Sequence, residues 1–181
     1  MKYISLNIPD VYLMEPKVHY DERGFFYESF NQKDFDQGIG RKINFVQDNH
    51  SKSSKNVLRG LHYQIQKSQT KLIRVIQGSV LDVAVDIRKS SPTFGQYITE
   101  ELSSENKKQL WIPEGFAHGC LALSEKVELL YKTTEFWEPN FERIIRWNDP
   151  DIGINWPNHI EPVLSKRDLF SKLLVDAEVF I

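Results

Sequence analysis

The stretch that decides the fold runs Val80-Leu81-Asp82-Val83-Ala84-Val85-Asp86-Ile87-Arg88. Large apolar residues occupy positions 81, 83, 85 and 87, and mostly polar residues stand between them. Successive side chains of a β-strand point to opposite faces of the sheet, so this period of two is typical of a strand with one apolar and one polar face. We therefore predict a half-buried antiparallel strand over these residues.

Further strands are predicted on both sides of this stretch from the same alternation or from short apolar runs. They are Gly24–Phe30, Val57–Tyr63, Lys71–Gln77, Tyr97–Leu102 and Val127–Thr134. The tripeptide Gln77-Gly78-Ser79 predicts a tight turn between two of them. The chain is therefore rich in short strands.

Helix signals are few and short. Asn31–Gln37 and Ser104–Lys108 each predict one or two turns, and Ser165–Val175 predicts the longest helix. Ser165 with Asp168 three residues later has the spacing of a capping box. Many short strands followed by a terminal helix favour an all-β barrel or jelly roll with short flanking helices over an alternating α/β sheet.

Length and composition narrow the classes of protein. The 181 residues suffice for one domain over 1–181, and a net charge of -2 lacks the basic excess of a duplex-binding protein. Met1–Pro9 carries no signal-peptide pattern, and no apolar run approaches the ~20 residues of a membrane helix. A single cysteine, Cys120, excludes an internal disulfide. We expect a cytoplasmic protein that binds neither nucleic acid nor membrane.

The segment Arg59-Gly60-Leu61-His62 carries the first candidate site residues. In an ideal strand Arg59 and His62 point to opposite faces, but a bulge at Gly60 would turn both to one face. From this segment alone, His62 is equally well interpreted as a core or edge histidine with one hydrogen bond.

A second histidine, His118, follows a turn in Trp111–Gly119, a stretch that resembles half of the cupin signature. The half that supplies two further histidines and a glutamate to the metal in metal-binding cupins is missing, and Gln64 stands where a second histidine is needed. A metal site requires about three converging ligands. The other histidines (His19, His50 and His159) are not spaced to provide them. We expect a barrel without a metal, in which His118 binds ligand or packs in the barrel wall.

Three more residues have both a structural and a functional interpretation. Tyr131 lies on the apolar face of its predicted strand and is either a core residue or part of an internal pocket. Lys71 is either solvated or a fixed positive charge at a barrel mouth. Asp168 either caps its helix or orients His62 and stabilises the charged imidazole.

Several motifs of the chain resemble those of the dTDP-4-dehydrorhamnose 3,5-epimerase family, and the match spans nearly the whole length. The motifs are Asp21–Phe26, Phe45–Ser51, Asn56–His62, Lys71–Arg74, Asp82–Arg88, Ser91–Gly95 and Trp111–Gly119. The resemblance implies a cupin-type jelly roll, a homodimer, no metal or other cofactor, and a nucleotide-diphosphate sugar as substrate.

The resemblance also assigns roles by position. It makes His62 the base, Asp168 its partner, Tyr131 the acid on the opposite face of the sugar, and Lys71 the cation beside the keto oxygen. The positions that match substrate contacts are Arg23, Glu28, Gln47, Asp48, Asn49, Arg59, His118, Glu142 and Arg167, and Phe26 is expected near the nucleotide base in the partner subunit's site. The sequence departs from the family in the loop Ile65–Thr70, at Cys120 and at Arg167.

The activity that the resemblance implies is inversion of C3 and C5 of dTDP-4-keto-6-deoxy-D-glucose, giving dTDP-4-keto-L-rhamnose. Protons on carbons beside a ketone are weakly acidic, and a base and an acid on opposite faces of the ring give inversion. The alternatives are a 3-epimerase or 5-epimerase of the same fold, another nucleotide carrier, and a non-catalytic cupin-like binding protein. A metal-dependent cupin oxygenase is the remaining alternative.

Overall fold

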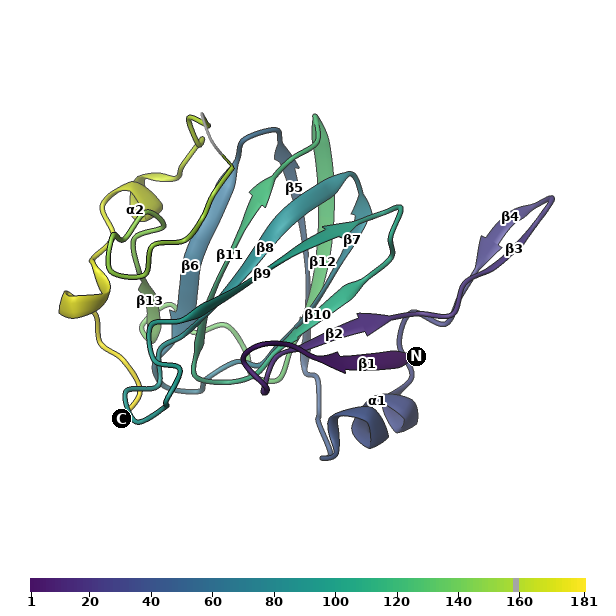
Figure 1. The fold of residues 1–181 in the computed structure, drawn as a ribbon, viewed down its shortest axis with the longest axis horizontal. Helices are drawn as coiled ribbons and strands as arrows, with labels where there is room; N and C mark the ends of the chain where they lie inside the picture. Colours follow the sequence, from purple (N-terminus) through teal and green to yellow (C-terminus); the bar gives the residue numbers. More distant parts are fainter. Residues whose placement is uncertain (158–159) are drawn as a thin grey trace.

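The fold is built from two antiparallel sheets, as a computed structural model of residues 1–157 and 160–181 shows (Figure 1). The six-stranded sheet has the order β1-β2-β10-β7-β12-β5, and the five-stranded sheet has the order β13-β6-β11-β8-β9. A separate two-stranded sheet, β3-β4, projects from the body (Figure 1). The prediction of an all-β fold with short helices is confirmed.

The strands of the larger sheet are β1 (Lys2–Ser5), β2 (Tyr12–Glu15), β10 (Gln109–Ile112), β7 (Lys71–Gln77), β12 (Lys126–Thr133) and β5 (Gln47–Ser54). Those of the smaller sheet are β13 (Glu142–Ile144), β6 (Leu58–Gln64), β11 (Phe116–Ala122), β8 (Ser79–Asp86) and β9 (Tyr97–Ser103). The projecting hairpin is β3 (His19–Asp21) with β4 (Gly24–Phe26). Five predicted strands therefore match observed ones to within two residues at each end.

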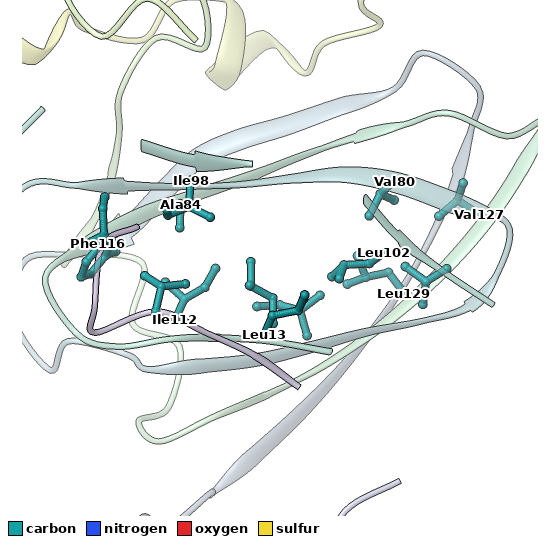
Figure 2. Close-up of a cluster of buried hydrophobic side chains, with 14 of the residues drawn as sticks. Leu13, Val80, Ala84, Ile98, Leu102, Ile112, Phe116, Val127 and Leu129 are labelled. Carbon is teal, nitrogen blue, oxygen red and sulfur yellow. The ribbon is translucent and has the colours of Figure 1, made fainter. Parts of the chain in front are cut away.

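The core lies between the two large sheets. Leu13, Ile73 and Leu129 come from the larger sheet, and Ala84 and Leu102 come from the smaller one. Figure 2 shows side chains of both groups meeting in one layer. Full burial of one such side chain contributes about 1.5–3 kcal/mol, so this layer is what holds the sheets face to face.

Strand β8 is buried on both faces, so the predicted half-buried strand is wrong in this respect. Ala84 lies in the layer between the sheets, whereas Val83 and Val85 pack on the other face in a second cluster with Ile145 and Ile152. The chain after β13 covers that outer face (Figure 1). Asp82, expected on a solvated polar face, shares the face of Ala84 between the two sheets and is fully buried.

The predicted bulge at Gly60 is confirmed. His62 pairs with His118 and Arg59 pairs with Cys120, so three steps along β6 match two along β11. Gly60 has φ 136°, and a Cβ there would lie 2.5 Å from the Cα of Gly119. Only glycine fits this close approach, and the bulge turns Arg59 and His62 to the same face.

The turn at Gly78 is a corner between the two sheets. Its φ of 74° lets the chain leave β7 of the larger sheet and enter β8 of the smaller one without an intervening loop. The predicted tight turn is present, and the strands that it joins do not pair with each other.

Helix α1 (Gln32–Ile39) confirms the first predicted helix. Asn31 caps its N-terminus by accepting hydrogen bonds from the N–H groups of Lys33 and Asp34, and Gly40 ends it in the left-handed region. The segment Ser104–Lys108 forms a turn and no helix, because Lys107 has a left-handed φ of 54°.

The predicted helix Ser165–Val175 is wrong in length. Helix α2 covers only Lys166–Leu169, and a single 3-10 turn, η1, covers Leu174–Asp176. The Ser171 hydroxyl donates to the carbonyl of Asp168 at 2.6 Å, where a continuing helix would place the N–H of Lys172. The helix therefore ends after one turn.

The predicted strand Gly24–Phe30 is also too long, because β4 ends at Phe26. Its one sheet neighbour is β3, and the hairpin extends away from the two large sheets (Figure 1). Tyr20, Phe25 and Phe26 are 57–74% exposed on it. The protein thus presents three aromatic rings on a projecting arm.

Candidate active site

A cavity of about 260 Å³ lies between the two large sheets beside the apolar core. The smaller sheet contributes Arg59, His62, Tyr63, Gln64, His118, Cys120 and Glu142 to its lining, the larger sheet contributes Ser51, Lys71, Leu129 and Tyr131, and two loops contribute Gln69 and Trp137. Six of the predicted site residues therefore meet in one cavity.

His62 is held by Asp168, the predicted partner. Its Nε2–H donates to Asp168 Oδ1 at 2.6 Å, and the carboxylate is almost completely buried. Burial by itself raises the pKa of Asp168, but hydrogen bonds from His62, Ser165 and the backbone of Gly60 outweigh it and leave the pKa below its ordinary value. The neutral imidazole then carries its lone pair on Nδ1, the atom able to accept a proton.

Lys71 is a buried ammonium group. It opens β7 on the same inward face as Ile73 and Val75, is 8% exposed, and donates from Nζ to the backbone oxygen of His62 at 3.3 Å. Burial lowers its pKa from 10.5 to about 8, against the attraction of Asp82 and Glu142. The side chain therefore carries a positive charge at neutral pH inside the cavity.

Asp82 is a site residue that the sequence interpretation missed. His118 Nε2–H donates to its two carboxylate oxygens at 2.9 and 3.1 Å, and Asp82 has no exposed surface. Burial lowers the pKa of His118 despite the opposing effect of Asp82, so the ring is neutral at pH 7 and offers Nδ1 as an acceptor. The one signal for Asp82 in the sequence is a charged residue in the middle of the strongly apolar strand Val80–Arg88, and we interpreted it as part of a solvated face.

Tyr131 faces His62 from the opposite sheet. It lies on the inward face of β12 with Val127 and Leu129, and both Tyr131 and His62 line the cavity. Burial, together with Cys120 and Glu142, raises the pKa of the Tyr131 phenol, which therefore keeps its proton at neutral pH. Burial likewise raises the pKa of the Cys120 thiol to about 12.

Arg59 and Glu142 line the cavity, whereas Arg167 lies outside its lining. The Arg59 guanidinium is exposed and donates to the Ser53 hydroxyl at 3.1 Å and to the backbone oxygen of Lys52. Arg167 is paired with Glu142 at 2.6 Å, and Glu142 lines the cavity. The exposed guanidinium of Arg59 therefore brings a positive charge to the solvent-facing side of the cavity.

The three neighbouring residues Gln47, Asp48 and Asn49 do not share a face. Asn49 pairs in register with Tyr131. The side-chain amide of Gln47 donates to Asn49 Oδ1 at 2.9 Å and accepts a hydrogen bond from the Trp137 N–H at 3.0 Å. Asp48 lies on the other face of β5 in an ion pair with Lys132 at 3.0 Å. Trp137, also missed from sequence, is half exposed on the rim of the cavity.

Arg23, Phe26 and Glu28 are not brought to the cavity of their own chain. Arg23 and Phe26 lie on the projecting hairpin, where Arg23 pairs with Asp21, and Glu28 is exposed just after it. Phe26 is 74% exposed. All three residues are exposed and therefore accessible to another molecule.

Two further observations concern metals and membranes. Among residues 1–157 and 160–181, no three His, Cys, Asp or Glu side chains converge to hold a metal ion. His159, considered above as a ligand, lies outside the described residues. In the same part of the chain, no helix has the length and apolar character needed to cross a membrane.

Together, the two-sheet barrel, the internal His–Asp pair, the buried ammonium and the protonated phenol define a barrel protein with an acid–base site. The family model for dTDP-4-dehydrorhamnose 3,5-epimerase matches residues 5–176. The dTDP-4-dehydrorhamnose 3,5-epimerase of Pseudomonas aeruginosa is 57% identical over 180 residues, which are 99% of each chain. The chain belongs to the dTDP-4-dehydrorhamnose 3,5-epimerase family, so it is an isomerase.

Solved structures agree with this assignment. The dTDP-6-deoxy-D-glucose-3,5-epimerase of Legionella pneumophila in complex with dTDP-4-keto-L-rhamnose is 48% identical, with a TM-score of 0.95 over 98% of this chain and 94% of that one. A 3'-monoepimerase of Streptomyces bikiniensis in complex with dTDP-quinovose is 34% identical, with a TM-score of 0.89 over 94% of this chain and 86% of that one. The predictions of the family and of a cupin-like barrel are confirmed.

Proposed function

We propose that this enzyme inverts C3 and C5 of dTDP-4-keto-6-deoxy-D-glucose and releases dTDP-4-keto-L-rhamnose. The observation that carries the proposal is that His62 and Tyr131 enter one cavity from opposite sheets. A sugar ring bound between them has a base on one face and an acid on the other. That arrangement inverts a carbon, whereas a base and an acid on the same face return the original configuration.

In the first step, His62 Nδ1 takes the proton from a carbon beside the ketone. Asp168 holds the ring through Nε2 and stabilises the imidazolium that forms. The electron pair moves into an enolate whose negative charge lies on the C4 oxygen. Tyr131 then gives its proton to the same carbon from the other face, and the ketone re-forms.

Lys71 supplies the charge that the enolate needs. A preorganised cation or donor aimed at a developing oxyanion contributes roughly 2.7–4 kcal/mol to the transition state. The ammonium group of Lys71 is fixed in the cavity by burial and by its hydrogen bond to the backbone oxygen of His62. The reaction therefore requires a base, an acid and a cation, and all three are side chains of this protein.

The nucleotide diphosphate is bound at the open edge of the cavity. Arg59 is exposed there, and a guanidinium group pairs well with phosphate oxygens. We propose that the enzyme acts as a homodimer in the cytoplasm, with the projecting hairpin of one subunit bringing Arg23 and Phe26 to the partner's nucleotide. The exposed rings of the hairpin and its projection beyond the two large sheets support this part of the proposal.

The test is incubation of the purified protein with dTDP-4-keto-6-deoxy-D-glucose in heavy water, followed by NMR. Deuterium at both C3 and C5, with the L-rhamno configuration in the product, is the expected result. Binding without any deuterium uptake would overturn the proposal in favour of a non-catalytic binding protein.

A second candidate is epimerisation at one carbon only. The similarity to a 3'-monoepimerase at a TM-score of 0.89 favours it, because this fold also occurs in an enzyme named for a single inversion. The same experiment distinguishes the two candidates, since a monoepimerase product carries the inverted configuration at one carbon.

A further inference from the structure

Ser165 makes two hydrogen bonds where a helix cap needs one. Its Oγ accepts the Asp168 N–H at 3.1 Å, which is the ordinary capping bond at the start of α2. Its hydroxyl proton is donated to Asp168 Oδ2 at 2.7 Å. The second bond does nothing for the helix backbone, and it fixes a carboxylate whose other oxygen contacts His62.

The residue three positions after the cap explains this arrangement. In a capping box that position is Glu or Gln, whose long side chain reaches back to the backbone N–H of the cap. Asp168 is one carbon shorter and is directed into the protein, where it is 3% exposed. Its Oδ1 lies 2.6 Å from His62 Nε2, so each carboxylate oxygen has its own side-chain donor.

We propose that Ser165 is a positioning residue for the reaction, acting through Asp168 on His62. Its hydroxyl holds the carboxylate plane so that Oδ1 faces Nε2, and it keeps the carboxylate ionised so that the imidazole lone pair stays on Nδ1. The inference rests on the proposed function, because it assigns His62 as the base. The helix cap and the catalytic dyad are thus one hydrogen-bonded chain of Ser165, Asp168 and His62.

Three variants separate capping from positioning. Ser165→Thr keeps both hydrogen bonds, Ser165→Asp keeps the capping acceptor but has no proton to donate, and Ser165→Ala keeps neither. Asn31→Ala removes the cap of α1, none of whose residues lines the cavity, and is the matched control for the loss of a cap. Thermal unfolding of all four variants reports the structural cost.

The functional measurements are the rate of deuterium uptake by the substrate and its dependence on pH. We expect Ser165→Ala and Ser165→Asp to slow the turnover rate by about tenfold, with KM changed less than the rate. Both should move the acid limb of the profile to higher pH, because a carboxylate without its donor binds a proton more readily. Ser165→Thr should restore the rate, and Asn31→Ala should leave the rate and the profile unchanged.

Normal deuterium uptake and an unmoved acid limb in Ser165→Asp would overturn the proposal, because capping alone would then explain the serine. The pH titration of the His62–Asp168 pair, followed by NMR of the ligand-free protein, gives a readout that needs no substrate. Failure of the native enzyme to act on the sugar would reject the proposed function. The positioning role of Ser165 would be rejected separately, by equal titration midpoints of the His62–Asp168 pair in the native protein and in Ser165→Asp.

Discussion

Replacing Lys71 with methionine should abolish turnover and stabilise the fold. The pKa of Lys71 falls from 10.5 to about 8 because burial of its ammonium group outweighs the attraction of Asp82 and Glu142. At about 1.36 kcal/mol per pKa unit, that difference is roughly 3 kcal/mol of destabilisation at neutral pH. Loss of the hydrogen bond to the His62 backbone removes about 1 kcal/mol, so we expect Lys71→Met to be about 2 kcal/mol more stable.

The difference in stability between Lys71→Met and the native protein should depend on pH. Between pH 8 and 10.5 the unfolded chain binds a proton at Lys71 that the folded protein has released, so the native protein gains stability as pH rises through this window. The advantage of Lys71→Met should therefore be largest below pH 8 and disappear towards pH 10.5. Urea unfolding of both proteins at pH 7 and pH 10 measures it. Equal stabilities at pH 7, or a difference that does not change with pH, would refute the description of Lys71 as a buried cation.

Two further predictions concern the bulge and the hairpin. Gly60→Ala should lower the free energy of unfolding in urea by at least about 2 kcal/mol more than Gly40→Ala does. Both glycines have positive φ, but a Cβ at position 60 meets Gly119, whereas a Cβ at position 40 meets open space. Similar losses of stability in the two variants would contradict the assigned role of the bulge. Phe26→Ala should raise KM about tenfold through lost stacking on the nucleotide base. An unchanged KM would remove the hairpin from the substrate site.

The parts of the site that were predictable from sequence depend on local geometry. Gly60 signals a bulge by itself, and the bulge is sufficient to bring Arg59 and His62 to one face. Tyr131 follows Val127 and Leu129 at intervals of two residues, so it shares their inward face on β12. The roles of these residues came from the family motifs, because a histidine in a strand is compatible with both core and active site.

The residues that were missed depend on distant parts of the chain. The sequence predicts a solvated face for Asp82, because no local pattern reveals that the segment after β13 covers the opposite face of β8. Strand β5 was missed because its sequence, QDNHSKSS, is polar on both faces, although alternate residues are turned inward. Apolar periodicity detects a core-facing strand and is silent on one that lines a polar cavity.

The most direct test of the proposed acid and base compares His62→Asn with Tyr131→Phe in heavy water. His62→Asn should take up no deuterium at C3 or C5, because no base remains on its face of the ring. Tyr131→Phe should still exchange the proton removed by His62 while forming little inverted product. Undiminished deuterium uptake by His62→Asn would contradict the mechanism.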